Sequence, residues 1–151
     1  MFNYIILLSC AVIVSSHLCL INPHQRGPLG GLNVPGAEDL DCNLTAPPCG
    51  GRPREQSILS LKADSNLTVV FQKNIGYFDP ALPGNFTISV GADENSFTEL
   101  VTFEDSETKD LYLHFIHDVV VPSTLGHHIF QVTYVTSPGV VYYQCADITV
   151  I

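Results

Sequence analysis

An alternation of apolar and polar residues, from Ser57 to the last residue, is the feature that most constrains this chain. Side chains of a strand point alternately to its two faces, so a period of two indicates strands with one buried face. We find no amphipathic helix pattern. The segments of this kind are residues 57–62, 67–73, 86–90, 99–103, 111–116, 119–121, 128–135 and 140–151. Seven or eight short strands predict an all-β fold, an immunoglobulin-like antiparallel β-sandwich.

Residues 17–54 have a different character. They are rich in glycine and proline, and neither a helical nor a strand period is present. A loop region of this length is uncommon inside a compact domain unless it has another constraint. Three of the chain's cysteines fall within it. We therefore expect a long N-terminal loop region that lies across the sandwich and is pinned by disulfides.

The first residues have the pattern of a signal peptide. An apolar run covers residues 4–14, and Val14 and Ser16 occupy the −3 and −1 places of a cleavage site after Ser16. The run is too short for a transmembrane helix, and no second one follows. The prediction is a signal peptide at residues 1–16 and one domain at residues 17–151, secreted into the extracellular space with no membrane anchor.

Charge and cysteine content agree with an extracellular protein. All 15 acidic and 6 basic residues follow Ser16, and a net charge of −9 excludes electrostatic binding of nucleic acid. Cys10 leaves with the leader, and an even number of cysteines remains, which implies two disulfides with three possible connectivities. Three sequons predict N-glycosylation of a secreted chain. Their acceptors are Asn43, Asn66 and Asn85.

Cleavage after Ser16 would make His17 the first residue of the mature chain. Its α-amine and imidazole can chelate one metal ion, and a flat set of nitrogen and carboxylate ligands suits Cu(II). The alternative is that His17 is merely the first residue of a secreted domain without a metal site, or that cleavage falls at another residue.

Several motifs together resemble the copper acquisition factor family, secreted proteins related to lytic polysaccharide monooxygenases. The resemblance begins at His17 and covers almost all of the predicted mature chain. The further matching segments are Pro23-x-x-Arg26-Gly27, Pro47-Pro48-Cys49-Gly50-Gly51, Val69-Val70-Phe71-Gln72-Lys73-Asn74, Pro83-Gly84-x-Phe86 and Tyr143-Gln144-Cys145-Ala146-Asp147-Ile148. Their order and spacing make the match more specific than any one of them.

The resemblance implies an immunoglobulin-like sandwich with a histidine-brace copper site. By position, His17 corresponds to the N-terminal ligand and Asp147 to a carboxylate ligand near the C-terminus. It also implies the disulfides Cys49–Cys145 and Cys19–Cys42. The expected cofactor is copper (Cu2+). The partners it suggests are a membrane copper transporter that receives copper or an extracellular glycan.

The chain departs from the family at the internal histidine of the brace. Where that histidine is expected, shortly after Lys73-Asn74, the sequence has Tyr77. A phenol has a pKa near 10 and is a poor copper ligand at neutral pH unless the metal lowers that pKa. His24, seven residues after His17, is the best local substitute. Tyr77 and His24 are therefore additional candidate ligands beside His17 and Asp147.

We interpret the remaining histidines as residues without a functional role. In residues 111–116 the apolar alternation predicts that Leu113 and Phe115 face inward and that His114 lies on the surface. His117 is likewise predicted to be a surface residue. His127 and His128 are neighbours, so their side chains point to opposite faces of a strand and do not easily share a metal.

These observations leave three functions open. The first is a secreted protein that sequesters or delivers copper, which is not an enzyme. The second is a metal-free recognition or adhesion module, which Tyr77 makes credible. The third is a copper-dependent enzyme that oxidises polysaccharides, although tryptophan, common on polysaccharide-binding faces, is absent. No nucleophile elbow, phosphate loop or zinc-protease motif indicates another reaction.

Overall fold

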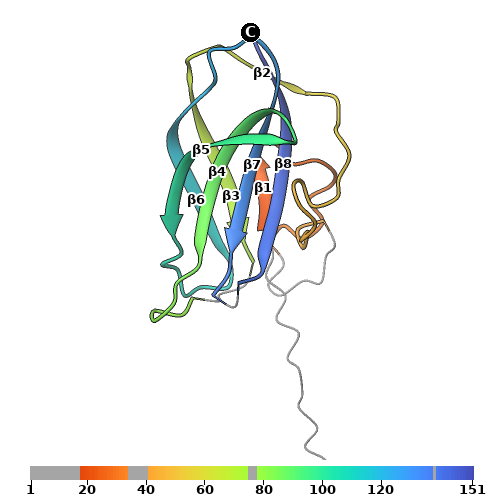
Figure 1. The fold of residues 1–151 in the computed structure, drawn as a ribbon. Helices are drawn as coiled ribbons and strands as arrows, with labels where there is room; N and C mark the ends of the chain where they lie inside the picture. Colours follow the sequence, from red (N-terminus) through yellow and green to blue (C-terminus); the bar gives the residue numbers. More distant parts are fainter. Residues whose placement is uncertain (1–17, 34–40, 75–77, 138) are drawn as a thin grey trace, which may run out of the picture.

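The computed structural model describes residues 18–33, 41–74, 78–137 and 139–151. These residues form a sandwich of two β-sheets, and the described part of the chain contains no helix, so no membrane-spanning helix is present there either (Figure 1). The strands are β1 (Leu18–Asn22), β2 (Leu59–Leu61), β3 (Asn66–Lys73), β4 (Asn85–Asp93), β5 (Ser96–Glu104), β6 (Tyr112–Val120), β7 (Gly126–Val135) and β8 (Val141–Val150). The predicted all-β sandwich is thus confirmed.

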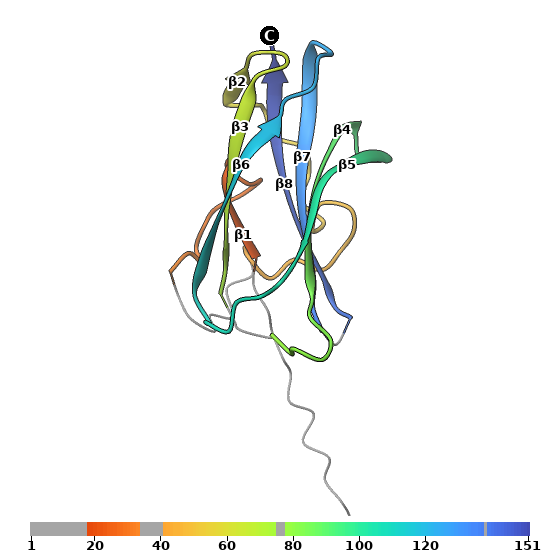
Figure 2. The same cartoon turned by 90° about the vertical axis from the view of Figure 1, so that its left-hand side faces the viewer.

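The two sheets differ in size. The smaller has the order β1-β3-β6 and the larger the order β2-β8-β7-β4-β5. All pairs are antiparallel except β2 with β8, which run parallel. Seen from the side, the sheets face each other with β6 and β5 on the near side (Figure 2).

The core lies between the inner faces of the two sheets, as the period of two predicts. Phe71 of β3 and Phe86 of β4 are fully buried, and their ring centroids are 5.1 Å apart. Tyr134 of β7 stacks on Phe86 at 4.3 Å. Burying large aromatic side chains of this kind removes the most apolar surface from water per residue, so these rings tie the two sheets together.

The N-terminal loop region crosses the edge of the larger sheet beside β8 (Figure 1). The structure contains the two disulfides Cys19–Cys42 and Cys49–Cys145, the pairing that the family resemblance implies. The backbone N–H of Arg26 donates to the carbonyl of Cys145 at 2.7 Å. The two disulfides pin this region as expected, but the prediction that it contains no strand was wrong at residues 18–22. They form β1, which pairs with β3 and shows no alternation because its first three residues are all buried.

The prediction for β6 was wrong at His114. The side chain of His114 is 8% exposed and points into the sandwich, whereas Phe115 is 54% exposed on the outer face. The physical reason lies in the partners: His114 stacks on Phe71, with ring centroids 4.8 Å apart, and β6 is an edge strand whose outer face is left open. Apolar alternation therefore assigned the wrong face.

The β4–β5 hairpin carries its turn, residues 93–96, away from the rest of the sheet. Strand irregularities between Ile88 and Ser89 and between Val90 and Asp93 increase the bend of β4. As a result the hairpin crosses in front of β7 and β8 and brings Glu94 to the N-terminal loop region (Figure 1).

Candidate functional site

The start of β1 is held by three contacts. The backbone N–H of Leu18 donates to the carbonyl of Cys42 at 2.8 Å, and its carbonyl accepts from Nε2 of Gln144, also at 2.8 Å. The disulfide Cys19–Cys42 follows immediately. His17 itself lies outside the described residues, but the residue after it has a fixed position between β3 and β8.

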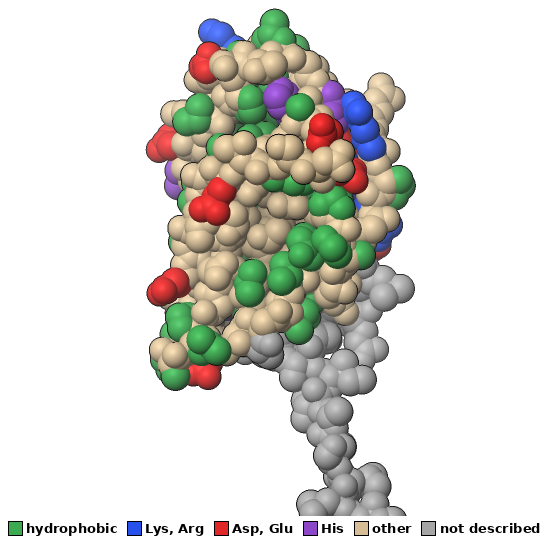
Figure 3. Space-filling view, viewed as in Figure 1, with side chains coloured by type: hydrophobic (Ala, Val, Ile, Leu, Met, Phe, Trp, Pro, Cys, Tyr) green, Lys and Arg blue, Asp and Glu red, His purple; other side chains and the backbone are tan. Residues whose placement is uncertain are grey.

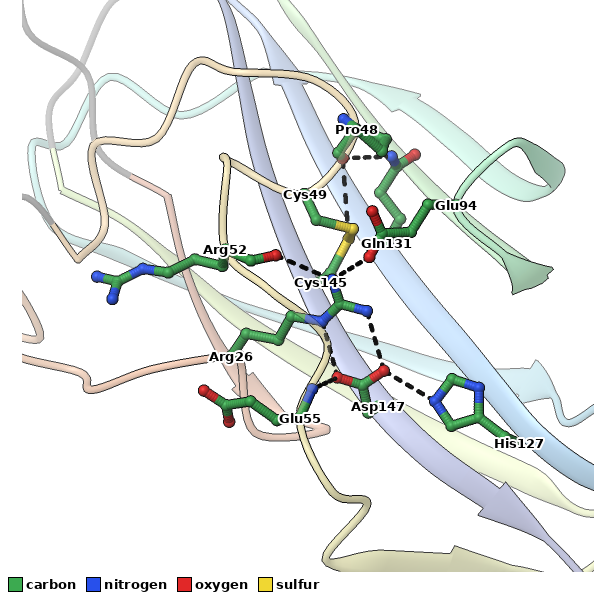
Figure 4. Close-up of a disulfide and its surroundings, with 10 residues drawn as sticks. All are labelled: Arg26, Pro48, Cys49, Arg52, Glu55, Glu94, His127, Gln131, Cys145 and Asp147. Carbon is green, nitrogen blue, oxygen red and sulfur yellow. Dashed lines mark hydrogen bonds and ion pairs between the residues drawn. A yellow bond between two sulfur atoms is a disulfide. The ribbon is translucent and has the colours of Figure 1, made fainter.

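Asp147 is the centre of a buried polar network (Figure 4). Its carboxylate accepts bonds from Nε and Nη2 of Arg26, at 2.7 and 2.9 Å. It also accepts from the backbone N–H of Glu55 at 2.9 Å and lies 2.8 Å from Nε2 of His127. A carboxylate has about four sites for hydrogen bonds, so the described partners occupy all of them.

These bonds change the acidity of the carboxyl group. Burial alone raises the pKa of Asp147, but the hydrogen bonds from Arg26, from the Glu55 N–H and from His127, together with the charge of Arg26, outweigh it. The pKa of Asp147 therefore lies below its ordinary value, and the group is ionised at neutral pH.

Arg26 is almost entirely buried, with a side chain 1% exposed. Besides Asp147 it bonds Glu94 from the β4–β5 hairpin and the carbonyl of Arg52, the latter at 3.1 Å. Burial alone lowers the pKa of Arg26, but the two carboxylates raise it above its ordinary value. The guanidinium thus joins the loop region, β8 and the hairpin as a permanent charge.

His127 is the partner that the sequence did not reveal. Its Nε2 faces Asp147, whereas its Nδ1 is buried and has no hydrogen-bond partner among the described residues. Strand β7 pairs with β8 so that Ile129 lies opposite Asp147, which puts His127 on the same face two residues away. The sequence pattern alone does not give this register, so it does not show that His127 meets Asp147.

Two of the predicted ligands come together and two are not described. His24 and Asp147 both line a hollow of about 30 Å³, room for one or two water molecules. His24 is exposed, and its Nδ1 donates to the carbonyl of its neighbour Gln25 at 2.7 Å. Tyr77, like His17, lies outside the described residues. Among the residues that are described, no three His, Cys, Asp or Glu side chains are grouped closely enough to hold a metal ion.

The positions of Leu18 and Asp147 bear on the predicted copper brace. Gln144, which contacts Leu18, precedes Asp147 by three residues on β8, a rise of about 10 Å. The two side chains also point to opposite faces of the strand, because they are an odd number of residues apart. The described residues alone thus do not fit a copper site, and the amine and ring of His17 would have to supply its nitrogen ligands.

The space-filling view shows the distribution of charged side chains on the face of the molecule that is seen in Figure 1. Histidine, acidic and basic side chains gather at its upper right, beside the crossing hairpin (Figure 3). The side chain of Glu94, a member of the Asp147 network through Arg26, is 38% exposed. The network therefore reaches the surface on the side of the N-terminal loop region.

A second buried polar cluster lies at the C-terminal end of β3, around Lys73. The ammonium group of Lys73 is fully buried and donates to both carboxylate oxygens of Asp105, at 2.7 and 2.8 Å, and to the carbonyl of Glu107. The hydroxyl of Tyr134 donates to the same carboxylate at 2.6 Å. Burial, and next the charge of Lys73, lower the pKa of the nearby His114 to about 4.

Comparison with known proteins shows which solved structures have a similar fold. No protein-family model and no curated protein matches this chain. Among solved structures, the catalytic domain of a lytic polysaccharide monooxygenase from Listeria monocytogenes matches with a TM-score of 0.53 at 15% identity, over 89% of this chain and 99% of that one.

Two further structures match more weakly. The AA10 lytic polysaccharide monooxygenase of Streptomyces lividans has a TM-score of 0.44 at 18% identity, and AA10A of T. fusca has 0.39 at 17%. The matches cover 66% and 61% of this chain, and they span only 61% and 52% of those chains. The likeness to the Listeria monocytogenes domain, at 15% identity, concerns the fold alone: the chain has a β-sandwich like that of a lytic polysaccharide monooxygenase domain.

Proposed function

We propose that this chain is a secreted copper(II)-binding protein of the copper acquisition factor type, which sequesters or delivers copper. Residues 1–16 are removed as a signal peptide, and residues 17–151 form the copper-binding domain. The α-amine and imidazole of His17 supply two nitrogen ligands. Copper, when bound, is held as Cu(II) by these nitrogens, and the chain's own contribution is to fix where they lie.

The observation that carries the proposal is the anchoring of Leu18. Its N–H and carbonyl are both bonded, and Cys19 is cross-linked to Cys42. A metal site gains affinity when its ligands are held in place before the metal arrives. A chain that begins one residue before this anchor would present its amine and imidazole from a rigid strand.

Asp147 as a copper ligand stays a prediction. Its four hydrogen bonds set the condition for that role, because the metal has to replace at least one donor. His127, with a side chain 19% exposed, is more accessible than Arg26 and is the donor easiest to displace. The proposal itself depends on His17 and not on Asp147.

The test begins with protein secreted from eukaryotic cells. Its intact mass and N-terminal sequence report the cleavage site, and a Cu(II) titration followed by electron paramagnetic resonance reports the site. We expect a chain that begins at His17 and binds one copper ion with nitrogen hyperfine structure. Metal ligands must be deprotonated, so affinity should fall as the pH is lowered.

A matched control keeps the imidazole and moves the amine. One added alanine before His17 leaves every described residue in place but removes the chelate between the α-amine and its own ring. We expect this extended chain to bind copper much more weakly. Equal affinity of the two chains, or cleavage at another residue, would refute the proposal.

One observation favours a second candidate, a metal-free recognition module. The carboxylate of Asp147 is already saturated by protein donors, as in a structural ion pair. If copper binds no better than to a control peptide beginning with histidine, the module interpretation replaces the first. A copper-loaded sample incubated with ascorbate and chitin or cellulose tests the oxidative enzyme, for which the shared fold is the support.

A further inference from the structure

We propose that N-glycans on Asn66 and Asn85 cover the two open strand edges on one side of the sandwich and keep the protein monomeric. The inference goes beyond copper binding and rests only on secretion. It starts from the two edge strands on that side, β6 of the smaller sheet and β5 of the larger one, which Figure 2 views directly.

Each of these strands has a partner on one side only. In the described part of the chain, β6 pairs with β3 alone and β5 with β4 alone. Their other edges leave backbone N–H and C=O groups free to pair with a second chain. Strand β6 also bears exposed apolar side chains, with Phe115 and Val120 each 54% exposed. Long apolar edges of this kind are sites of self-association.

The first sequon on this side belongs to β3 and faces β6. Asn66 is exposed, and its Nδ2 donates to a carboxylate oxygen of Asp118 at 3.2 Å. The hydroxyl of Thr68 lies 3.1 Å from Nδ1 of His117. Both side chains of the sequon thus reach the edge strand on the outer face, and Leu67 between them points into the core.

The second sequon repeats this arrangement on the other sheet. Asn85 of β4 lies opposite Glu104 of β5, and the hydroxyls of Thr87 and Thr102 are 2.9 Å apart. Phe86 between them is fully buried. Each edge strand therefore has a sequon on its only partner strand, with the acceptor asparagine on the outer face.

The chemistry of the modification fits both sites. Nδ2 of asparagine forms a bond to the anomeric carbon of an oligosaccharide, whose bond to a lipid-linked diphosphate donor breaks, and one amide proton leaves with the released lipid diphosphate. The second amide proton of Asn66 remains and can keep the bond to Asp118. That bond would direct the first sugar over β6. A glycan is bulky and well hydrated, so it blocks the approach of another strand.

Asn43 provides the matched control. It follows Cys42 in the loop region, and the next residue, Leu44, accepts a bond from the N–H of Tyr143 of β8. Strand β8 lies on the far side of β7 and β4 from β5. A glycan on Asn43 therefore lies away from both open edges.

The experiment uses protein secreted from eukaryotic cells in four forms: wild type, Asn43→Gln, Asn66→Gln, and Asn66→Gln with Asn85→Gln. Glycopeptide mass spectrometry reports occupancy, and light scattering coupled to size-exclusion chromatography reports mass. We expect occupied Asn66 and Asn85 and a monomeric wild type. The Asn43→Gln variant should stay monomeric, and the double variant should form dimers and larger species, with Asn66→Gln between them.

A folding defect is separated from edge pairing by a second variant. Phe115→Lys added to the double variant places a charge on the open edge without touching the core, and it should restore the monomer. Unoccupied Asn66 and Asn85, a monomeric double variant, or association that Phe115→Lys fails to reverse would each overturn the proposal.

Discussion

Asp147 and Arg26 are 121 residues apart in sequence, and two parallel bonds join the carboxylate to Nε and Nη2 of the guanidinium, at 2.7 and 2.9 Å. Neither side chain is more than 2% exposed. This bidentate pair attaches the N-terminal loop region to the last strand. Because Glu94 also bonds Arg26, the pair fixes the β4–β5 hairpin as well.

We expect Arg26→Ala to destabilise the fold by about 3–5 kcal/mol, because it leaves the carboxylate of Asp147 buried without its strongest donor. Urea unfolding followed by circular dichroism measures the change. The exposed Arg54 supplies the control, and Arg54→Ala should change stability by less than about 0.5 kcal/mol. A small effect of Arg26→Ala would mean that water replaces the guanidinium.

For copper, Asp147→Asn separates a ligand from a structural carboxylate. We expect a smaller loss of copper affinity than the extra N-terminal alanine causes, because the amine and ring of His17 carry the site and Asp147 is occupied by Arg26 and His127. Titration calorimetry on the folded variant gives both values. A loss as large as that from blocking the amine, with an altered resonance spectrum, would identify Asp147 as a ligand.

Much of the fold could be predicted from the sequence because burial on one face forces a period of two. Most of the strands follow from that period, and the pinned loop region follows from the positions of cysteine, glycine and proline. Strand β1 was not predicted, because its first three residues are all buried and do not alternate, and the predicted segments 111–116 and 119–121 form the single strand β6. At β6 the same rule failed. An edge strand can leave apolar residues such as Phe115 outside, and a neutral imidazole can stack between aromatic rings as His114 does.

The candidate site could be predicted only in part. Asp147 could be predicted as a candidate because a carboxylate is unfavourable within a β-branched strand, but its partners are set by long-range pairing. Arg26 entered only as part of a motif, and the sequence does not show that its guanidinium is buried against β8. The link from His127 requires the β7–β8 register, which local pattern does not give.

Stability should depend on pH through His114. The pKa of its buried imidazole is about 4, lowered by burial and next by the charge of Lys73, against 6.5 when unfolded. The folded state therefore resists protonation, so the contribution is complete above pH 6.5 and is lost as the pH falls toward 4. The loss is about 3 kcal/mol at most. The contribution of Asp147, whose pKa is lowered, is lost only below pH 3.8.

Urea unfolding at several pH values between 7 and 4 measures this dependence. We expect His114→Phe, which keeps a ring against both Phe71 and Phe86, to remove most of the slope. The exposed His117 is the control, and His117→Ala should leave the slope unchanged. An unchanged slope in His114→Phe would assign the pH dependence to other groups.

The two disulfides should have separable roles. Cys49–Cys145 closes a loop of 96 residues and Cys19–Cys42 one of 23. The entropy of loop closure predicts losses of about 4.7 and about 3.4 kcal/mol when each pair is replaced by alanine. Loss of the Cys19–Cys42 disulfide should lower copper affinity more than loss of Cys49–Cys145. Cys19 directly follows the anchored Leu18, whereas Cys145 lies on β8, where its carbonyl accepts a bond from the N–H of Arg26. Urea unfolding and copper titration of the two double variants measure the losses of stability and of copper affinity. If the variant that loses more stability also loses more copper affinity, the copper site depends on the whole fold and not on the anchor of β1.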